Sequence, residues 1–162
     1  MADDAKATPA STLNELIETC KDGANGYRAA ADAVTESSLK ATFTGFATQR
    51  GTFATELQGL VSKVGGGATP EEHGSILGVV HRGWIEVKGW VKDLVTGHDE
   101  IAVLAECERG DAFAVKAYED AIFGNMPQSV QPVLMRQAAE VKRAYEMVKK
   151  LKASREAKKA KG

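Results

Sequence analysis

Polar side chains interrupt the apolar stripes of several expected helices, and their types are those that could do chemistry in a core. Arg50, Gln137 and Glu108, with Asp111 three residues after it, lie near the middle of otherwise apolar helical stripes, and Cys20 and Tyr27 hold the comparable places in the first helix. Antiparallel packing brings such mid-helix residues to one level of a bundle. An unpaired buried charge costs several kcal/mol, so a buried Arg50 needs an anion. We therefore predict a buried Arg50–Glu108 ion pair, with Gln137 or Tyr27 completing its hydrogen bonds.

The same side chains allow two other arrangements. Arg50 and Glu108 are long enough to reach solvent between helices instead of pairing in the core. Glu106, Glu108 and Asp111 also form an acidic cluster on one helix. Hard cations accept carboxylate oxygens, so a weakly bound iron or manganese ion is the alternative to ion pairs with Arg109 and Arg50.

Cysteine and histidine chemistry is poorly supported by the spacing. Cys20 and Cys107 lie far apart in apolar patterns and no CxxC motif occurs, so we expect reduced, buried side chains rather than a zinc site. His81 lies beside Trp84, and Trp90 follows six residues later, so the two indoles cannot both face one narrow core. We expect these three residues, His81, Trp84 and Trp90, at a helix edge or a subunit interface, which suits a dimer.

Apolar residues recur at steps of three and four along most of the chain, which predicts an all-α protein. No useful period-2 segment appears, and glycine or proline breaks separate the patterns. We expect an antiparallel up-down bundle with four core helices and one additional helix packed across or alongside them. The expected helices run from a cap at Ser11 or Thr12 to about Val34, from Leu39 to Val64, from Pro70 to Thr96 (the additional helix), from about Asp99 to Ile122 and from Gln128 to Lys152.

Composition favours one globular domain. The chain has 162 residues, of which 43% are hydrophobic and 27% charged, with a net charge of −1. This balance argues against a general electrostatic nucleic-acid binder. No apolar run approaches the ~20 residues of a membrane-spanning helix. The start of the sequence lacks a secretory pattern, so we expect a cytoplasmic protein without a membrane partner.

The expected organisation has three parts: a flexible lead over residues 1–10, the bundle over 11–152 and a basic flexible tail over 153–162. From residue 142 to the end there are nine Lys or Arg residues and two Glu. This stretch lacks interleaved aromatic and apolar anchors, so binding to nucleic acid would be weak and salt-sensitive. A solvated tail is the simpler interpretation, and we expect nucleic acid not to be a partner.

Several short motifs together resemble one protein family. The segments are Leu13–Gly23, Gly26-Tyr27-Arg28, Gln49-Arg50 with Phe53 and Glu56-Leu57, Gly74-Ser75 with His81-Arg82-Gly83-Trp84, and Glu106–Asp111 with Tyr118. They resemble an uncharacterised bacterial family described as a four-helix-bundle, ferritin-like domain of unknown function, over about residues 12–152. The resemblance implies a ferritin-like bundle fold and no settled activity.

The ferritin-like resemblance also implies where metal ligands should fall. Di-iron sites of such bundles take a Glu from each of two helices and a Glu-x-x-His from each of the other two. No Glu-x-x-His occurs in this chain. Aligned on the family pattern, most ligand positions carry other residues, namely Cys20 in the first helix, Gln49 and Thr52 in the second, and Lys142 and Tyr145 in the last. The fourth helix alone keeps carboxylates, at Glu106 and Glu108.

We therefore expect a bundle without enzymatic activity or a cofactor. No nucleophile elbow, phosphate-binding loop or dinucleotide fingerprint is present. The expected function is that of a stress-associated or protein-interaction module that self-associates as a dimer or binds another protein. The alternative is a weak or degenerate di-metal carboxylate protein.

Overall fold

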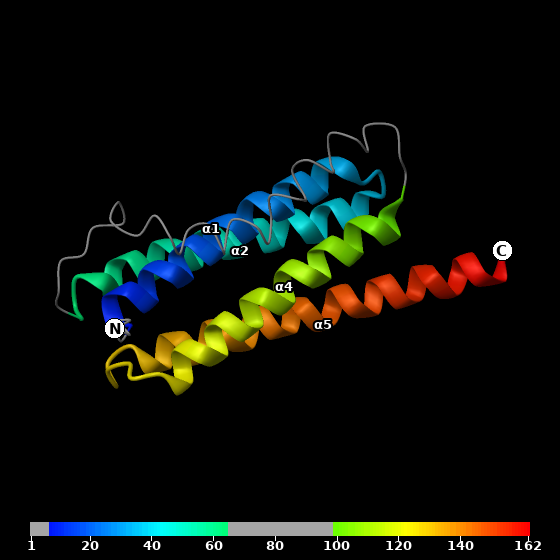
Figure 1. The fold of residues 1–162 in the computed structure, drawn as a ribbon. Coiled ribbons are helices and arrows are strands. Elements are labelled where there is room, and N and C mark those ends of the chain that lie inside the picture. The colour runs from blue at the N-terminus through cyan, green and yellow to red at the C-terminus, as the bar shows by residue number, and fades with distance from the viewer. Residues whose placement is uncertain (1–6, 65–98) are drawn as a thin grey trace, which may run out of the picture.

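The computed structural model describes residues 7–64 and 99–162, and these residues form four helices with no strand (Figure 1). The prediction of an all-helical bundle is confirmed. The additional helix expected from Pro70 to Thr96, with His81, Trp84 and Trp90, lies outside the described residues. The four helices are α1 (Pro9–Ala33), α2 (Ser37–Val61), α4 (Glu100–Phe123) and α5 (Gln131–Lys161).

The helices form two antiparallel hairpins. α1 packs on α2, α4 packs on α5, and α1 also contacts α4. Figure 1 shows that α1 and α5 run in one direction along the bundle and that α2 and α4 run in the other. The described chain therefore leaves α2 at one end of the bundle and enters α4 at the opposite end.

The first helix begins earlier than its sequence pattern indicates. The side chain of Thr8 accepts a hydrogen bond from the backbone N–H of Ser11 at 3.1 Å, and Pro9 opens the helix. Proline suits the first turn because its missing N–H would have no helical partner there. The expected cap at Ser11 or Thr12 is therefore wrong, and helix already replaces part of the expected lead.

The last helix continues beyond its expected end at Lys152. α5 is helical to Lys161, so the expected frayed tail is not observed. Ala, Lys, Arg and Glu dominate this stretch, and all are strong helix formers. Arg155 also holds it against the bundle, with Nη2 2.5 Å from Glu36 and Nε 3.2 Å from Glu100.

The core consists of two apolar clusters joined end to end. One contains Leu13, Leu57 and Leu134, and the other contains Phe43 and Leu104. The boundary between them falls at one level on three helices, where Gly23, Arg50 and Asp111 are buried. The bundle therefore carries its buried charges at the junction of two apolar half-cores. In the described residues, no helix is both long and apolar enough to cross a membrane.

Candidate functional site: a polar layer in the bundle core

The centre of the layer is an ion pair between α2 and α4. Arg50 Nη2 donates to Asp111 Oδ1 at 2.9 Å, and the two side chains are 2% and 0% exposed. The other terminal nitrogen of Arg50 donates to Gln49 Oε1 at 2.9 Å. A charge-assisted bond between buried partners meets the requirement that neither charge be left alone.

Tyr27 completes the coordination of the buried carboxylate. Its hydroxyl donates to Asp111 Oδ2, the oxygen not bound by Arg50. The Arg50 guanidinium carbon also lies 5.9 Å from the centre of the Tyr27 ring, within the range of a cation–π contact. Both oxygens of Asp111 are thus engaged by side chains of this chain.

A glycine on α1 makes room for the arginine. A Cβ atom at Gly23 would lie 3.3 Å from Arg50 Cγ, which is closer than most real Cβ contacts. Gly23 is buried in the middle of a helix, where glycine costs about 1 kcal/mol relative to alanine. Close packing of the Arg50 stem on the α1 backbone explains why this position lacks a side chain.

A second hydrogen-bonded chain runs from the core to the surface beside the ion pair. Cys20 Sγ lies 3.1 Å from the Tyr118 hydroxyl, which donates to Gln137 Oε1 at 2.7 Å. Gln137 in turn donates to Glu56 at 3.1 Å, and Glu56 also accepts from Arg136. These five side chains connect all four described helices through polar contacts.

Burial sets the protonation of the layer. It raises the pKa of Asp111, with Arg50 and Tyr27 acting in the opposite direction. Burial also lowers the pKa of Arg50 and is the largest single effect, but the interactions with Asp111, Tyr27 and Cys20 together outweigh it and the net shift is upward. Burial and then the Asp111 charge raise the pKa of Tyr27, so its hydroxyl keeps its proton as a donor. At neutral pH Arg50 therefore carries its charge, and the hydroxyls of Tyr27 and Tyr118 keep their protons.

Burial also suppresses thiol chemistry. It raises the pKa of Cys20 to about 11, against lowering by the Tyr118 hydrogen bond and the Arg50 charge. It raises the pKa of Cys107 well above the ordinary value, with the charges of Asp111 and Glu106 adding to the effect. Both cysteines are free and buried. Neither has the thiolate character that a reactive cysteine requires.

The structure changes one of the predicted partners. Arg50, Gln137 and Tyr27 lie in the core, but Arg50 pairs with Asp111 and not with Glu108. Glu108 is half-buried, and its carboxylate lies 2.5 Å from Lys152 Nζ on α5. Asp111 belongs to the same sequence stripe as Glu108, and spacing favours it, because Leu104, Asp111 and Tyr118 follow each other at intervals of seven and all three are fully buried.

The acidic cluster considered for a metal is divided among three ion pairs. Glu106 pairs with Arg109 on the same helix, Glu108 with Lys152, and Asp111 with Arg50. Within residues 7–64 and 99–162, His, Cys, Asp and Glu side chains nowhere gather in threes suited to a metal ion. Each carboxylate of the cluster is therefore engaged by a cation of the chain.

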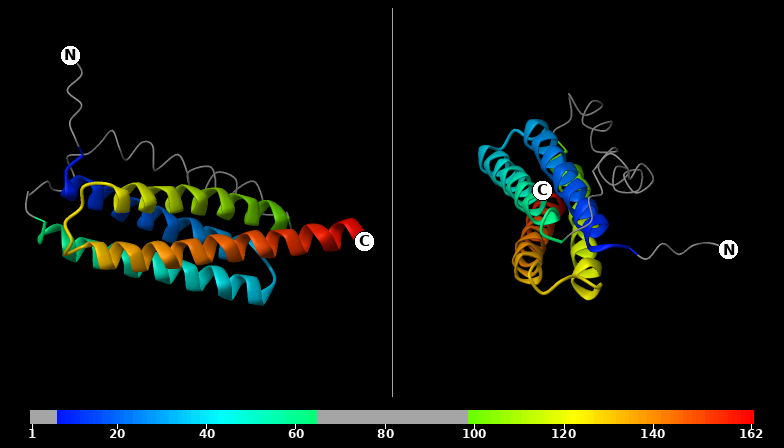
Figure 2. Two further views of the ribbon diagram at one scale, coloured as in Figure 1. Left: turned by 90° about the horizontal axis from the view of Figure 1, so that it is seen from below. Right: turned by 90° about the vertical axis from the view of Figure 1, so that its left-hand side faces the viewer.

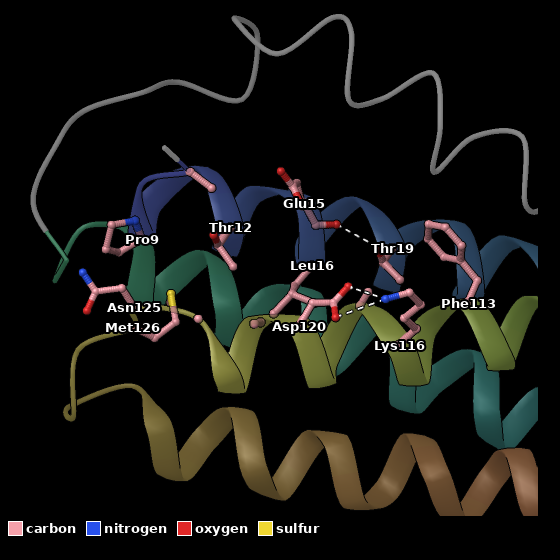
Figure 3. A pocket seen from close by; sticks show the side chains of 14 residues that line it. Pro9, Thr12, Glu15, Leu16, Thr19, Phe113, Lys116, Asp120, Asn125 and Met126 are labelled. Carbon is pink, nitrogen blue, oxygen red and sulfur yellow. Dashed lines mark hydrogen bonds and ion pairs between the residues drawn. The ribbon is translucent and has the colours of Figure 1, made fainter. Parts of the chain in front are cut away.

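A cavity of about 350 Å³ lies between the start of α1 and the end of α4 (Figure 3). Leu16, Phe113 and Met126 contribute apolar surface, and the Lys116–Asp120 ion pair lies along it. Its volume is at the lower end of the range of small-ligand pockets. The cavity is separate from the polar layer.

These helices and their buried layer define an all-helical bundle. A family model described as a domain of unknown function (DUF2383) matches residues 8–123. The match covers more than half of the chain, so the chain belongs to this family. It includes α1, α2 and α4, and therefore Tyr27, Arg50 and Asp111. No curated protein matches the chain.

Proposed function

We propose that this protein is a ferritin-like bundle that acts as a non-enzymatic interaction module, with a metal-free polar layer at its centre. One observation carries the proposal. Asp111, the fully buried carboxylate of the described core, has one oxygen bound to Arg50 and the other to Tyr27. A di-metal centre needs several carboxylates and imidazoles that converge on the ions. A guanidinium beside the carboxylate supplies the positive charge instead.

The direction of the helices supports the ferritin-like part of the proposal. Ferritin-like bundles consist of two hairpins joined by one long crossover, and α2 and α4 run in the same direction here (Figure 1). We place the expected additional helix, Pro70 to Thr96, in this connection. At 27 residues it matches the length of α1, which has 25. Hydrogen exchange tests it: slow amide exchange over 70–96 is expected, and exchange at random-coil rates would contradict it.

Metal analysis of the purified protein tests the metal-free centre. We expect iron, manganese and zinc far below one ion per chain and no iron oxidation. The alternative, a weak metal at the acidic cluster, would give binding that the variant Glu106→Gln/Glu108→Gln abolishes. About two ions per chain with oxidase activity would overturn the proposal.

Self-association is the interaction that we propose first. Phe123 is 88% exposed at the end of α4, directly before Gly124 and Asn125 of the cavity wall. An exposed aromatic beside an apolar hollow is typical of a protein contact. Sedimentation velocity should show a dimer, and Phe123→Glu should weaken it at least tenfold while Lys40→Glu on α2 leaves it unchanged. A monomer at about 100 μM would contradict a dimer of even modest affinity.

A further inference from the structure

The charges of this protein are segregated onto one helix. α5 carries ten of the 21 Lys and Arg residues and three of the 22 Asp and Glu residues. Its net charge is therefore +7, and the rest of the chain carries −8. The net charge of the chain is close to zero although α5 is strongly basic and the rest of the chain is acidic.

The basic residues of α5 divide into those that have an acidic partner and those that do not. Arg136, Lys152 and Arg155 pair with acids of the neighbouring helices α2 and α4 or of the α1–α2 turn, and Arg143 pairs with Glu140 on α5. Six other residues are exposed and form no ion pair within the described part of the chain. They are Lys142, Lys149, Lys150, Lys158, Lys159 and Lys161.

The C-terminal end of α5 is also fixed in position by ion pairs, so that it is available to bind a partner. Figures 1 and 2 show the helix extending beyond the ends of its neighbours. Arg155 fixes the base of this extension through Glu36 and Glu100. The sequence predicts only weak nucleic-acid binding by this segment, on the assumption that it is frayed. Because the segment is a fixed helix, its backbone loses less conformational entropy when its lysines bind a partner.

We propose that the outward face of α5, defined by Lys142, Lys149, Lys150 and Lys161, binds the phosphate backbone of double-stranded nucleic acid without sequence preference. Lys158 and Lys159 line hollows on the bundle side of the helix, beside Glu36 and Glu100. From Lys142 to Lys161 the axial rise is about 29 Å at 1.5 Å per residue. A duplex offers a phosphate charge about every 1.7 Å along such a length. The face carries no arrangement of Asn, Gln or unpaired Arg that could read base edges.

Two other occupants fit this face less well. Within residues 7–64 and 99–162, nine of the 16 acids that a second copy would offer already form ion pairs. They are Glu18, Glu36, Glu56, Glu100, Glu106, Glu108, Asp111, Asp120 and Glu140. A membrane-surface helix needs an exposed apolar face. The apolar face of α5, with Leu134, Val141 and Val148, is buried in the bundle. Met135 and Met147 are exposed on this helix, but they are 12 residues apart and lie on different sides of it, so they form no continuous apolar face.

Fluorescence anisotropy with a labelled duplex of about 24 base pairs tests the proposal on the full-length protein. With four contacts, the slope of log K against log salt should be about −4, so affinity falls about two-hundredfold between 50 and 200 mM salt. The variant Lys142→Gln/Lys149→Gln/Lys150→Gln should reduce the slope to about −1. These side chains lie outside the core, and circular dichroism confirms that the bundle is retained.

A matched control variant distinguishes the effect of losing lysines on α5 from the effect of lowering the net charge of the protein. Lys40→Gln/Lys63→Gln/Lys116→Gln removes the same charge from α2, its C-terminal turn and α4, and should leave affinity and slope unchanged. Equal losses in both variants would overturn the proposal, as would no binding at 25 mM salt. Binding to vesicles of anionic phospholipid without binding to the duplex would also overturn it.

Discussion

At the scale of single residues, the Arg50–Asp111 pair is the feature with the largest energetic consequence. Arg50→Met leaves Asp111 buried without its cation, which should lower the free energy of unfolding by about 3–5 kcal/mol. Arg50→Met/Asp111→Asn should recover most of this loss, because it leaves no buried charge and keeps an acceptor for Tyr27. Urea unfolding of both variants measures the difference. Stability that is unchanged or higher in the single variant would show that the pair is not buried in solution.

Cys20 gives a pH dependence of definite sign. Its pKa is about 11 in the folded protein, above the ordinary value of a thiol, so stability is fully present below the ordinary value and is lost as pH rises toward 11. One such proton changes the free energy of unfolding by about 1.4 kcal/mol per pH unit. Cys20→Ser keeps a hydroxyl beside Tyr118 but does not titrate there. Urea unfolding at pH 8 to 10.5 should therefore show a shallower decline in the serine variant, and parallel curves would refute this prediction.

Residue types in the layer could be predicted from sequence, but the pairing could not. Arg50 and Gln137 stand out because they interrupt apolar stripes. Glu108 and Asp111 are three residues apart on α4, and helix–helix rotation of less than one turn decides which of them faces Arg50. The side chain of Lys152 on α5 draws Glu108 outward. Such a choice depends on packing between helices that are distant in sequence.

At the scale of elements, the end of α5 depends on one arginine. Arg155→Gln removes its ion pairs with Glu36 and Glu100 while keeping a good helix former. Amide exchange over residues 153–161 should become faster, by about fivefold if the contacts contribute near 1 kcal/mol. Lys159→Gln on the same segment is the control and should change little. Equal rates in wild type and Arg155→Gln would mean that propensity alone holds the helix.

Helix existence was predictable from periodicity, whereas helix ends were less so. The start of α4 matches the expectation because Asp99 caps it, accepting from the Ala102 N–H at 3.2 Å. α1 begins earlier than expected because Thr8 and Pro9 form a cap ahead of Ser11 and Thr12. α5 ends later than expected because solvent-facing Lys and Ala residues can continue a helix and so do not mark its end.

At the scale of the whole molecule, the two apolar clusters should unfold as one unit. Leu57→Ala in one cluster and Phe43→Ala in the other should each cost about 2–5 kcal/mol. Both residues are fully buried. Each urea curve should stay a single transition with an unchanged slope, because all four described helices run through both clusters. A second transition in either variant would show that the half-cores are independent.

The level shared by Gly23, Arg50 and Asp111 also bears on how the helices find their alignment. Apolar stripes repeat every turn, so by themselves they tolerate sliding of one helix past another. A slip of one turn moves the guanidinium about 5.4 Å from its carboxylate and leaves both charges among apolar side chains. The ion pair thus favours one alignment of the helices over alignments that are shifted by a turn. For this role, the difference in energy between alignments matters more than the net contribution of the ion pair to stability.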